Sequence, residues 1–449
     1  MKKSFIIAFF GVLSSFAQSK PDCEKQFNDF EVYYKKEFNE KAVLTEEGRE
    51  RALRLIQNTS KECPSYDKNI YVFSEDMLLQ IIRPMNVGEE RQKWTKHLIE
   101  LYDKSGQHFP ETAKENMLKK LVISYNSSIF SFEQAFKSFD EFYNRDKQVF
   151  SAEALLIYTN LVLTRQNLSS NNNVSSEYIK KTDDLSTSIA TKISELERKK
   201  SNSKDEKEIK NIDADIASLK IASKNISSGL KTANLNCDVW NKFYKEEYQK
   251  NSSDIFWLEN ALSRLDTYKC AINNELFTEM AQKYYELKKT AKSAYYLGNI
   301  AQQQKDYKKA QAYFTESTEL ETNKSEKAKL HYRIADLQKG TDKTQAKANL
   351  EKAIENNPEM FEAYIVLSRL YANANDCANN EFERKTLNLL AAENIKRITT
   401  VNTKYNTSAQ KIIDGYLEKA PTKDEIKKEK MKGKTVAFGC WINQSVTIK

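Results

Sequence analysis

The chain has 449 residues, which exceeds the usual size of one hydrophobic core, so we expect more than one packed unit. Ten glycines and six prolines are few for this length and favour long helices with few tight turns. The formal net charge of +8 is small beside 30% charged residues, and most lysines have an acidic residue three or four positions away. The composition therefore argues against a nucleic-acid-binding protein, which needs a clustered basic face.

The N-terminus reads "MKKSFIIAFFGVLSSFAQSK", with two lysines, an apolar run and then small residues. This order is typical of a secretory signal peptide, here residues 1–17 with cleavage before Gln18. The alternative is a cytosolic protein with an apolar first helix. Lys20, Pro21 and Asp22 precede Cys23, where a lipidation signal needs small and aliphatic residues, so we expect no lipoprotein. No later stretch reaches the roughly 20 apolar residues of a transmembrane helix.

Six cysteines in an exported chain allow disulfides. In an antiparallel helix pair the start of the first helix lies beside the end of the second, which makes Cys23 a neighbour of Cys63 and Cys237 a neighbour of Cys270. Cys377 and Cys440 remain as the third pair. The alternatives are buried free thiols and, less favoured, zinc.

A metal site has little support in the sequence. There is no CxxC motif, and the three histidines, His97, His108 and His331, are far apart. We therefore predict no metal and no cofactor.

Residues 18–167 are predicted to form a degenerate helical-repeat domain, because amphipathic segments alternate with turn and capping residues such as Pro64, Pro84 and Pro110. The expected helices cover about 24–39, 45–58, 70–82, 89–104, 111–126, 131–144 and 150–165.

Residues 168–236 follow a different period. The polar link "QNLSSNNNVSSEY" leads into a narrow apolar seam with charged flanks, which is typical of a coiled coil. The seam residues are Leu185, Ile189, Ile193, Leu196, Ile209, Ile212, Ile216, Leu219, Ile226 and Leu230. The polar interruption from Lys199 to Lys207 is long enough to reverse the chain, so we predict an antiparallel two-helix arm. One long helix that pairs with another chain is the alternative.

Residues 288–420 contain a repeat that follows a segment, 237–287, in which the predicted Cys237–Cys270 bond would join two helices. Ala310 and Ala346 lie 36 residues apart, and Gly298 and Ala335 lie 37 apart. Small residues allow two helices to approach closely and a large residue fills the space between them, as in a helix-turn-helix unit of about 34 residues. The packing residues are Leu297, Gly298, Ala310, Phe314, Ser317, Ala335, Ala346, Leu350, Ala353 and Pro358. A third copy begins near Tyr364.

Residues 421–449 are predicted to form a linker and a β-hairpin cap. "TVAFGCWI" and "SVTIK" flank Asn443-Gln444 and alternate in hydrophobicity. A bond from Cys440 to Cys377 would hold this hairpin against the last repeat and cap the stack. The lysine stretch 423–434 is interpreted as a solvated tail, or else as a contact with an anionic surface.

These repeat residues resemble the tetratricopeptide repeat (TPR). The order "NCDVW", "AYYLGNIA", "NDCANNEFERKTLNLLAAE", "YLEKAPTKDEI" and "GCWIN" is similar to a family of exported TPR proteins of Bacteroidota, although "EKMKGKT" is more lysine-rich than expected. The resemblance implies a location in the cell envelope, here the periplasm, and helical repeats interrupted by a coiled-coil segment. It implies no biochemical activity. The expected fold class is therefore an all-α, TPR-like helical-repeat solenoid with an inserted antiparallel coiled-coil arm and a small C-terminal β-hairpin.

The sequence contains no motif of a nucleophile, a metalloprotease or a phosphate-binding loop, and we predict no catalytic residue and no enzyme. Two hypotheses remain. The first is a scaffold that binds another envelope protein or peptide in its concave groove, with self-association through the arm as a further possibility. First helices line that groove, which makes Tyr295, Asn299, Gln302, Gln303 and Tyr332 the candidates. The second is a small-ligand or glycan-capture accessory module of an outer-membrane uptake system.

Overall fold

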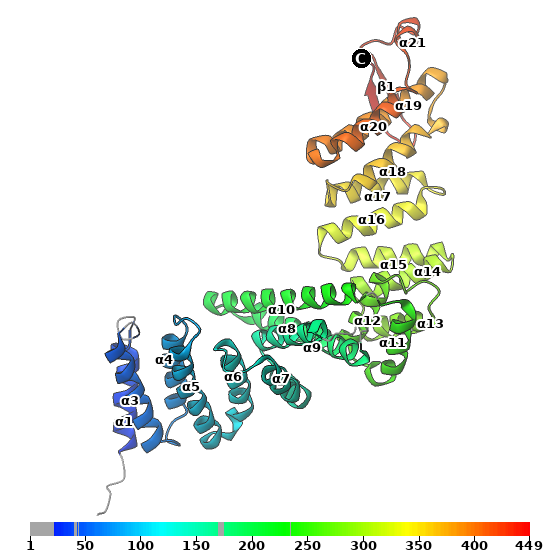
Figure 1. Ribbon diagram of the computed structural model, residues 1–449. Helices are drawn as coiled ribbons and strands as arrows, with labels where there is room; N and C mark the ends of the chain where they lie inside the picture. Colours follow the sequence, from blue (N-terminus) through cyan, green and yellow to red (C-terminus); the bar gives the residue numbers. More distant parts are fainter. Residues whose placement is uncertain (1–21, 40–42, 44, 169–174, 234) are drawn as a thin grey trace, which may run out of the picture. The chain divides into compact units, whose positions relative to one another are not determined.

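The computed structural model describes residues 22–39, 43, 45–168, 175–233 and 235–449. The predicted signal peptide lies outside these residues. The chain divides into two compact units, and the second begins at Leu235. Helices make up nearly all of the regular structure in the described residues, with one two-stranded sheet near the C-terminus (Figure 1). This confirms the all-α helical-repeat fold. No helix in the described ranges is long and apolar enough to cross a membrane.

The first unit begins with a stack of antiparallel helices joined by short links. These helices are α1 (Cys23–Val32), α3 (Glu46–Glu62), α4 (Asn69–Ile82), α5 (Glu89–His108), α6 (Ala113–Asn126), α7 (Phe132–Asp146) and α8 (Ala152–Leu168). The predicted helices are all present, with ends that differ by a few residues. The clearest difference is at α1, which ends at Val32 and continues as a π-helical turn through Glu37.

Local sequence determines where these helices start. Thr45 accepts a hydrogen bond from the Gly48 N–H at the start of α3, and Ser131 and Gln134 form a reciprocal capping box at the start of α7. The apolar faces of α1, α3, α4 and α5 share one core, which includes Phe30, Ile56 and Leu98.

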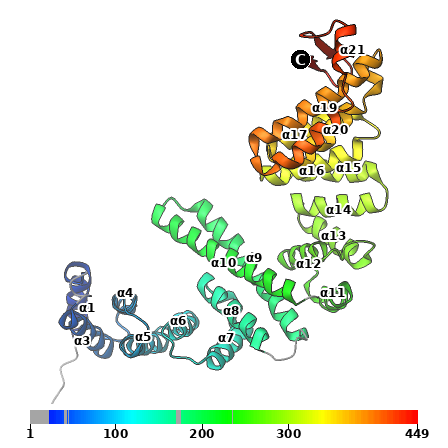
Figure 2. The ribbon, with the colours of Figure 1, turned by 45° about the horizontal axis from the view of Figure 1, so that its top comes forward.

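The arm consists of α9 (Ser176–Asn202) and α10 (Glu206–Thr232), which lie side by side in both views (Figures 1 and 2). The chain reverses only at residues 203–205, because the polar stretch from Lys199 to Asn202 stays helical. The alternative of one long helix is therefore wrong. Most of the predicted seam is buried, while Ile193, Leu196 and Ile209, near the turn, are partly exposed.

The arm also packs against α8, which the coiled-coil pattern does not predict. Asn225 of α10 donates to the Oδ1 atom of Asn160 at 3.1 Å. A Cβ atom at Gly229 would lie 2.8 Å from Leu163, so glycine permits the close approach of α10 to α8. The arm therefore packs together with α8 as a group of three helices, and the α9–α10 seam is not its only contact.

The second unit is a stack of helix pairs. Its helices are α11 (Cys237–Asn251), α12 (Ile255–Thr267), α13 (Glu275–Leu287), α14 (Ala291–Gln303), α15 (Tyr307–Leu320), α16 (Lys324–Gln338), α17 (Lys343–Asn356), α18 (Phe361–Ala372), α19 (Glu381–Val401), α20 (Asn406–Leu417) and α21 (Lys423–Lys428). Asp254, Thr290, Asp306 and Asp342 each accept a backbone N–H at the start of a helix, which explains the polar residues between the apolar runs.

Small residues and one phenylalanine hold the first repeat together. Gly298 of α14 faces Phe314 of α15, and a Cβ atom at Gly298 would lie 2.5 Å from the Phe314 ring. Ser317 donates to the Ala291 carbonyl at 2.6 Å and ties the other ends of the same helices. The predicted packing residues are buried except Pro358, which is exposed in the loop after α17. Pro358 therefore ends a helix instead of packing between two, and its carbonyl accepts the Tyr364 hydroxyl at 3.1 Å.

The C-terminal hairpin pairs β1 (Thr435–Phe438) with β2 (Gln444–Thr447) in antiparallel register. The turn predicted from the sequence lies at Asn443-Gln444, whereas the chain from Gly439 to Asn443 forms the connecting loop and Gln444 begins β2. Trp441 in this loop stacks on Tyr371 and donates to Asp376 at 3.3 Å, which draws the loop onto the repeat. Val436, Phe438 and Val446 join the core of α18 and α19.

All six cysteines are paired. The bonds are Cys23–Cys63, Cys237–Cys270 and Cys377–Cys440; the helix geometry predicts the first two, and the third is the pair that remained. The first two join the ends of neighbouring helices, and the third connects the hairpin loop to the link between α18 and α19.

The Gly298→Ala variant tests the close helix approach. We expect it to lower the free energy of unfolding by about 1–3 kcal/mol, because the buried Phe314 ring has no room to move away. Gly415→Ala is the matched control in a helix, since nothing lies within 4 Å of its Cβ position, and it should stabilise by about 0.5–1 kcal/mol. Urea denaturation measures both. Equal effects of the two substitutions would contradict the packing described for α14 and α15.

The double variant Cys377→Ala, Cys440→Ala tests the attachment of the hairpin. A two-stranded hairpin alone is marginal in water, so its amides should exchange faster once the bond is lost, with a stability loss of about 2–4 kcal/mol. Hydrogen exchange read by mass spectrometry checks this. Removal of the Cys237–Cys270 bond is the control, because it should leave exchange in the hairpin unchanged. Unchanged hairpin exchange in the first variant would show that packing alone holds it.

Candidate peptide-binding groove

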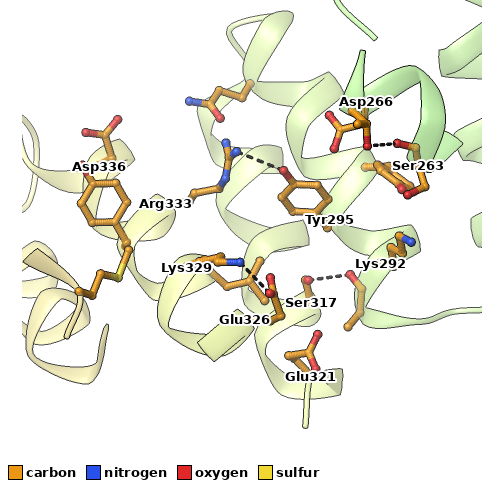
Figure 3. Close-up of a pocket in the computed structure, with 17 residues that line it drawn as sticks. Ser263, Asp266, Lys292, Tyr295, Ser317, Glu321, Glu326, Lys329, Arg333 and Asp336 are labelled. Carbon is orange, nitrogen blue, oxygen red and sulfur yellow. Dashed lines mark hydrogen bonds and ion pairs between the residues drawn. The ribbon is translucent and has the colours of Figure 1, made fainter. Parts of the chain in front are cut away.

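A cavity of about 800 Å³ lies on the face formed by the alternate helices α12, α14 and α16 of the second unit (Figure 3). Its lining mixes aromatic, apolar and charged side chains. The lining residues are Ser263, Asp266, Thr267, Ala291, Lys292, Tyr295, Tyr296, Gln302, Ser317, Glu321, Glu326, Lys329, Leu330, Tyr332, Arg333, Asp336 and Met360. We call this the α12–α14–α16 groove.

Three of the five predicted groove residues lie here. Tyr295, Gln302 and Tyr332 line the groove. Gln303 lines a separate polar cavity of about 530 Å³, where its Oε1 atom accepts the Asn273 N–H at 3.4 Å. Asn299 is partly buried and is not part of the lining. The cavity lining thus includes three of the predicted positions on α14 and α16, and α12 adds residues that were not predicted from the sequence.

Arg333 contacts both a hydroxyl and aromatic rings in the groove. Its guanidinium donates to the Tyr295 hydroxyl at 3.1 Å and lies over the Tyr295 ring, 5.3 Å from the centroid. It also lies 5.9 Å from the centroid of the buried Phe314 ring. Cation–π contact and the hydrogen bond together fix the orientation of this side chain. No carboxylate of the described residues forms an ion pair with it.

Asp266, near the end of α12, reaches into the same groove without a partner. Its carboxylate has neither a hydrogen bond nor an ion pair among the described residues. Burial raises the pKa of Asp266 above its ordinary value of 3.8, and the positive charges of Arg333 and Lys292 lower it in part. An ionised carboxylate here loses solvation without a contact that replaces it.

The other charged groups of the groove have partners. Lys329 pairs with Glu326 at 2.7 Å, Lys292 with Glu259 at 3.2 Å, and Asp336 with Lys339 at 2.5 Å. These side chains are largely solvent-accessible, so each pair contributes at most about 1 kcal/mol. Glu321 accepts the backbone N–H groups of Thr322 and Asn323.

The groove holds groups for binding, and two of its aliphatic hydroxyls already have structural contacts. Ser317 donates to Ala291, and Thr267 donates to the Ser263 carbonyl at 2.7 Å. No histidine or cysteine is part of the lining. Among the residues that the structure describes, no group of three or more His, Cys, Asp or Glu side chains could hold a metal ion.

Sequence reasoning missed Asp266 and Arg333. Arg333 directly follows Tyr332, so its place on the face of α16 was available from the repeat. Asp266 belongs to the segment before the first clear repeat, and its carboxylate looked like one of many solvated acids. The signal that singles it out is burial without a hydrogen-bond or ion-pair partner, which depends on the three-dimensional fold.

Comparisons with known proteins add little to this geometry. No family model matches the chain, and no curated protein matches it. Two solved structures of similar arrangement are yeast Tom70 and the APC/C hetero-tetramer Cut9–Hcn1. Tom70 is 11% identical, with 91% of this chain and 98% of that chain covered at a TM-score of 0.24. The Cut9–Hcn1 chain is 12% identical, with coverage of 88% and 90% and a TM-score of 0.29. Neither likeness is close enough to support an inference about function.

The Asp266→Asn variant tests whether the carboxylate is unpaired. The raised pKa means that the folded protein binds a proton here at higher pH than the unfolded chain does, so ionised Asp266 costs stability above its folded pKa. We expect the variant to be more stable than the wild type at pH 7. The difference should disappear below the ordinary carboxyl pKa of 3.8, where both states are protonated. Urea denaturation at several pH values measures it.

Asp376→Asn is the control with the opposite sign. A hydrogen bond from Lys343 lowers the pKa of Asp376, so this carboxylate stabilises the fold at neutral pH and the contribution disappears as the pH falls through its folded pKa. The variant should therefore be less stable at pH 7. A loss of stability in Asp266→Asn as well would contradict the absence of a partner for Asp266.

Proposed function

We propose that this protein is a non-catalytic TPR scaffold of the cell envelope that binds another envelope protein or peptide in the α12–α14–α16 groove. The observation that carries the proposal is the groove itself. Alternate helices of a regular stack place aromatic rings, amides and charges along one face, which is the arrangement that an extended or helical segment of a partner requires. The large apolar side chains of the repeats are mostly buried between helices, which leaves this face for recognition.

Two features support export to the periplasm. The N-terminal sequence has the order of a secretory signal peptide, and the resemblance to exported TPR proteins of Bacteroidota agrees with it. Three disulfides with no free cysteine in the described residues are typical of an oxidising compartment. Self-association through α9 and α10 stays a prediction.

Site-specific photo-crosslinking in cells tests the groove. A photoreactive amino acid at Gln302 or Tyr332 should give a recurrent adduct with one envelope protein, because both side chains line the groove. The same amino acid at Glu355, which is exposed on α17, is the matched control and should give no such adduct. Mass spectrometry identifies the partner. Absence of any adduct at the groove positions, or identical adducts at Glu355, would refute the proposal.

A small-ligand module is the second candidate, because a cavity of about 800 Å³ with three tyrosines in its lining is also large enough for a sugar chain. Titration calorimetry against oligosaccharides separates the two functions. Binding that Tyr295→Ala and Tyr332→Ala abolish would favour glycan capture, and no heat in these titrations together with a protein adduct would favour the scaffold.

A further inference from the structure

The α12–α14–α16 groove contains one negative and one positive side chain that the fold leaves without an ionic partner. Among the described residues of its lining, the remaining charged side chains have a carboxylate, an ammonium or a backbone N–H as partner. Asp266 has no such contact, and Arg333 contacts only a hydroxyl and two rings. Asp266 and Arg333 are thus the two charged side chains of the lining without a direct ion pair, although the positive charge of Arg333 acts on Asp266 through space.

Arg333 still has most of its binding capacity. A guanidinium carries five N–H donors, and the contact to Tyr295 uses one of its nitrogen atoms. The rings of Tyr295 and Phe314 hold the planar group in place, so little side-chain entropy is lost when an acceptor binds. A carboxylate can accept two parallel hydrogen bonds from such a group.

Asp266 offers the opposite chemistry. Its carboxylate is partly withdrawn from water, and a cation placed beside it would restore the lost interaction. Arg333 itself does not do so, because Tyr295 holds it, and the Tyr295 ring is drawn between the two charged side chains in Figure 3. The two groups come from different helices, α12 and α16, so a ligand that contacts both must lie across the groove.

We infer that the groove recognises a peptide segment with charges of both signs, a lysine or arginine that binds Asp266 and an aspartate or glutamate that binds Arg333. The inference rests on the proposed scaffold function and specifies its partner. Charge complementarity is the argument for this occupant, because a segment with only acidic side chains would leave Asp266 unpaired and a segment with only basic ones would leave Arg333 unpaired. A neutral segment would leave both unpaired.

Selection from a random 12-residue peptide library on the immobilised full-length protein tests the inference. Peptides enriched by the wild type should carry both a basic and an acidic residue at a recurrent spacing. Selection on Asp266→Asn should lose the basic preference alone, and selection on Arg333→Gln the acidic preference alone. Glu355→Gln and Lys352→Gln, two exposed positions of α17, are matched controls and should keep both preferences.

Fluorescence anisotropy on one enriched peptide gives the energetic test. Replacement of the peptide's basic residue by glutamine should weaken binding to the wild type at least about tenfold, and should have little effect on Asp266→Asn, because the two changes remove the same contact. Circular dichroism before each titration confirms that the variants are folded. Loss of affinity in both proteins alike would show that the basic residue binds elsewhere and would overturn the assignment.

The remaining outcomes separate the inference from the function on which it rests. The inference would be overturned if the enriched peptides showed no charge preference. If substitution of Tyr332 also weakened their binding, peptide binding in the groove would still stand. No enrichment of any peptide, together with no adduct in the photo-crosslinking experiment, would overturn the scaffold function itself.

Discussion

The close approach of paired helices is the constraint on which the second unit depends. Gly298 has no side chain at the point where the Phe314 ring lies against α14, and Ala310, Ala335 and Ala353 are fully buried at the corresponding contacts. Because the two helices of each pair lie close together, successive pairs can stack in a regular way. Alternate helices then share one face of the stack. The groove is a consequence of this repetition, since α12, α14 and α16 reach it from three successive pairs.

Much of this architecture could be predicted from the sequence, because the packing rule is local. Spacings of 36 and 37 residues, polar caps between apolar runs and cysteines at the ends of helix pairs each reflect a contact inside one or two neighbouring modules. Contacts between distant parts of the chain were not accessible in this way. The heptad pattern of α10 explains its contact with α9. The contacts of Asn225 and Gly229 with α8 do not produce a pattern that can be recognised in the sequence.

The groove also combines residues that the sequence predicts with residues that it does not. Tyr295 and Tyr332 follow from their positions on first helices, whereas Asp266 stands out only once its surroundings are known. A chain with 63 acidic and 71 basic residues offers many candidates, and among the described residues most of them are exposed or paired. The lysine stretch 423–434 illustrates this: Lys423, Lys428 and Lys434 are exposed on the surface around α21. The state of an individual charge depends on neighbours that come from other helices.

The hairpin bound to α18 and α19 has a consequence for assembly. A stack of helix pairs that ended with an uncovered apolar face could accept the first pair of another molecule and grow into filaments. Here Phe438, Ile442 and Ile448 occupy that face within the same chain, and a covalent bond from Cys440 keeps them there. The hairpin thus covers the apolar surface of α18 and α19 that such end-to-end growth would use.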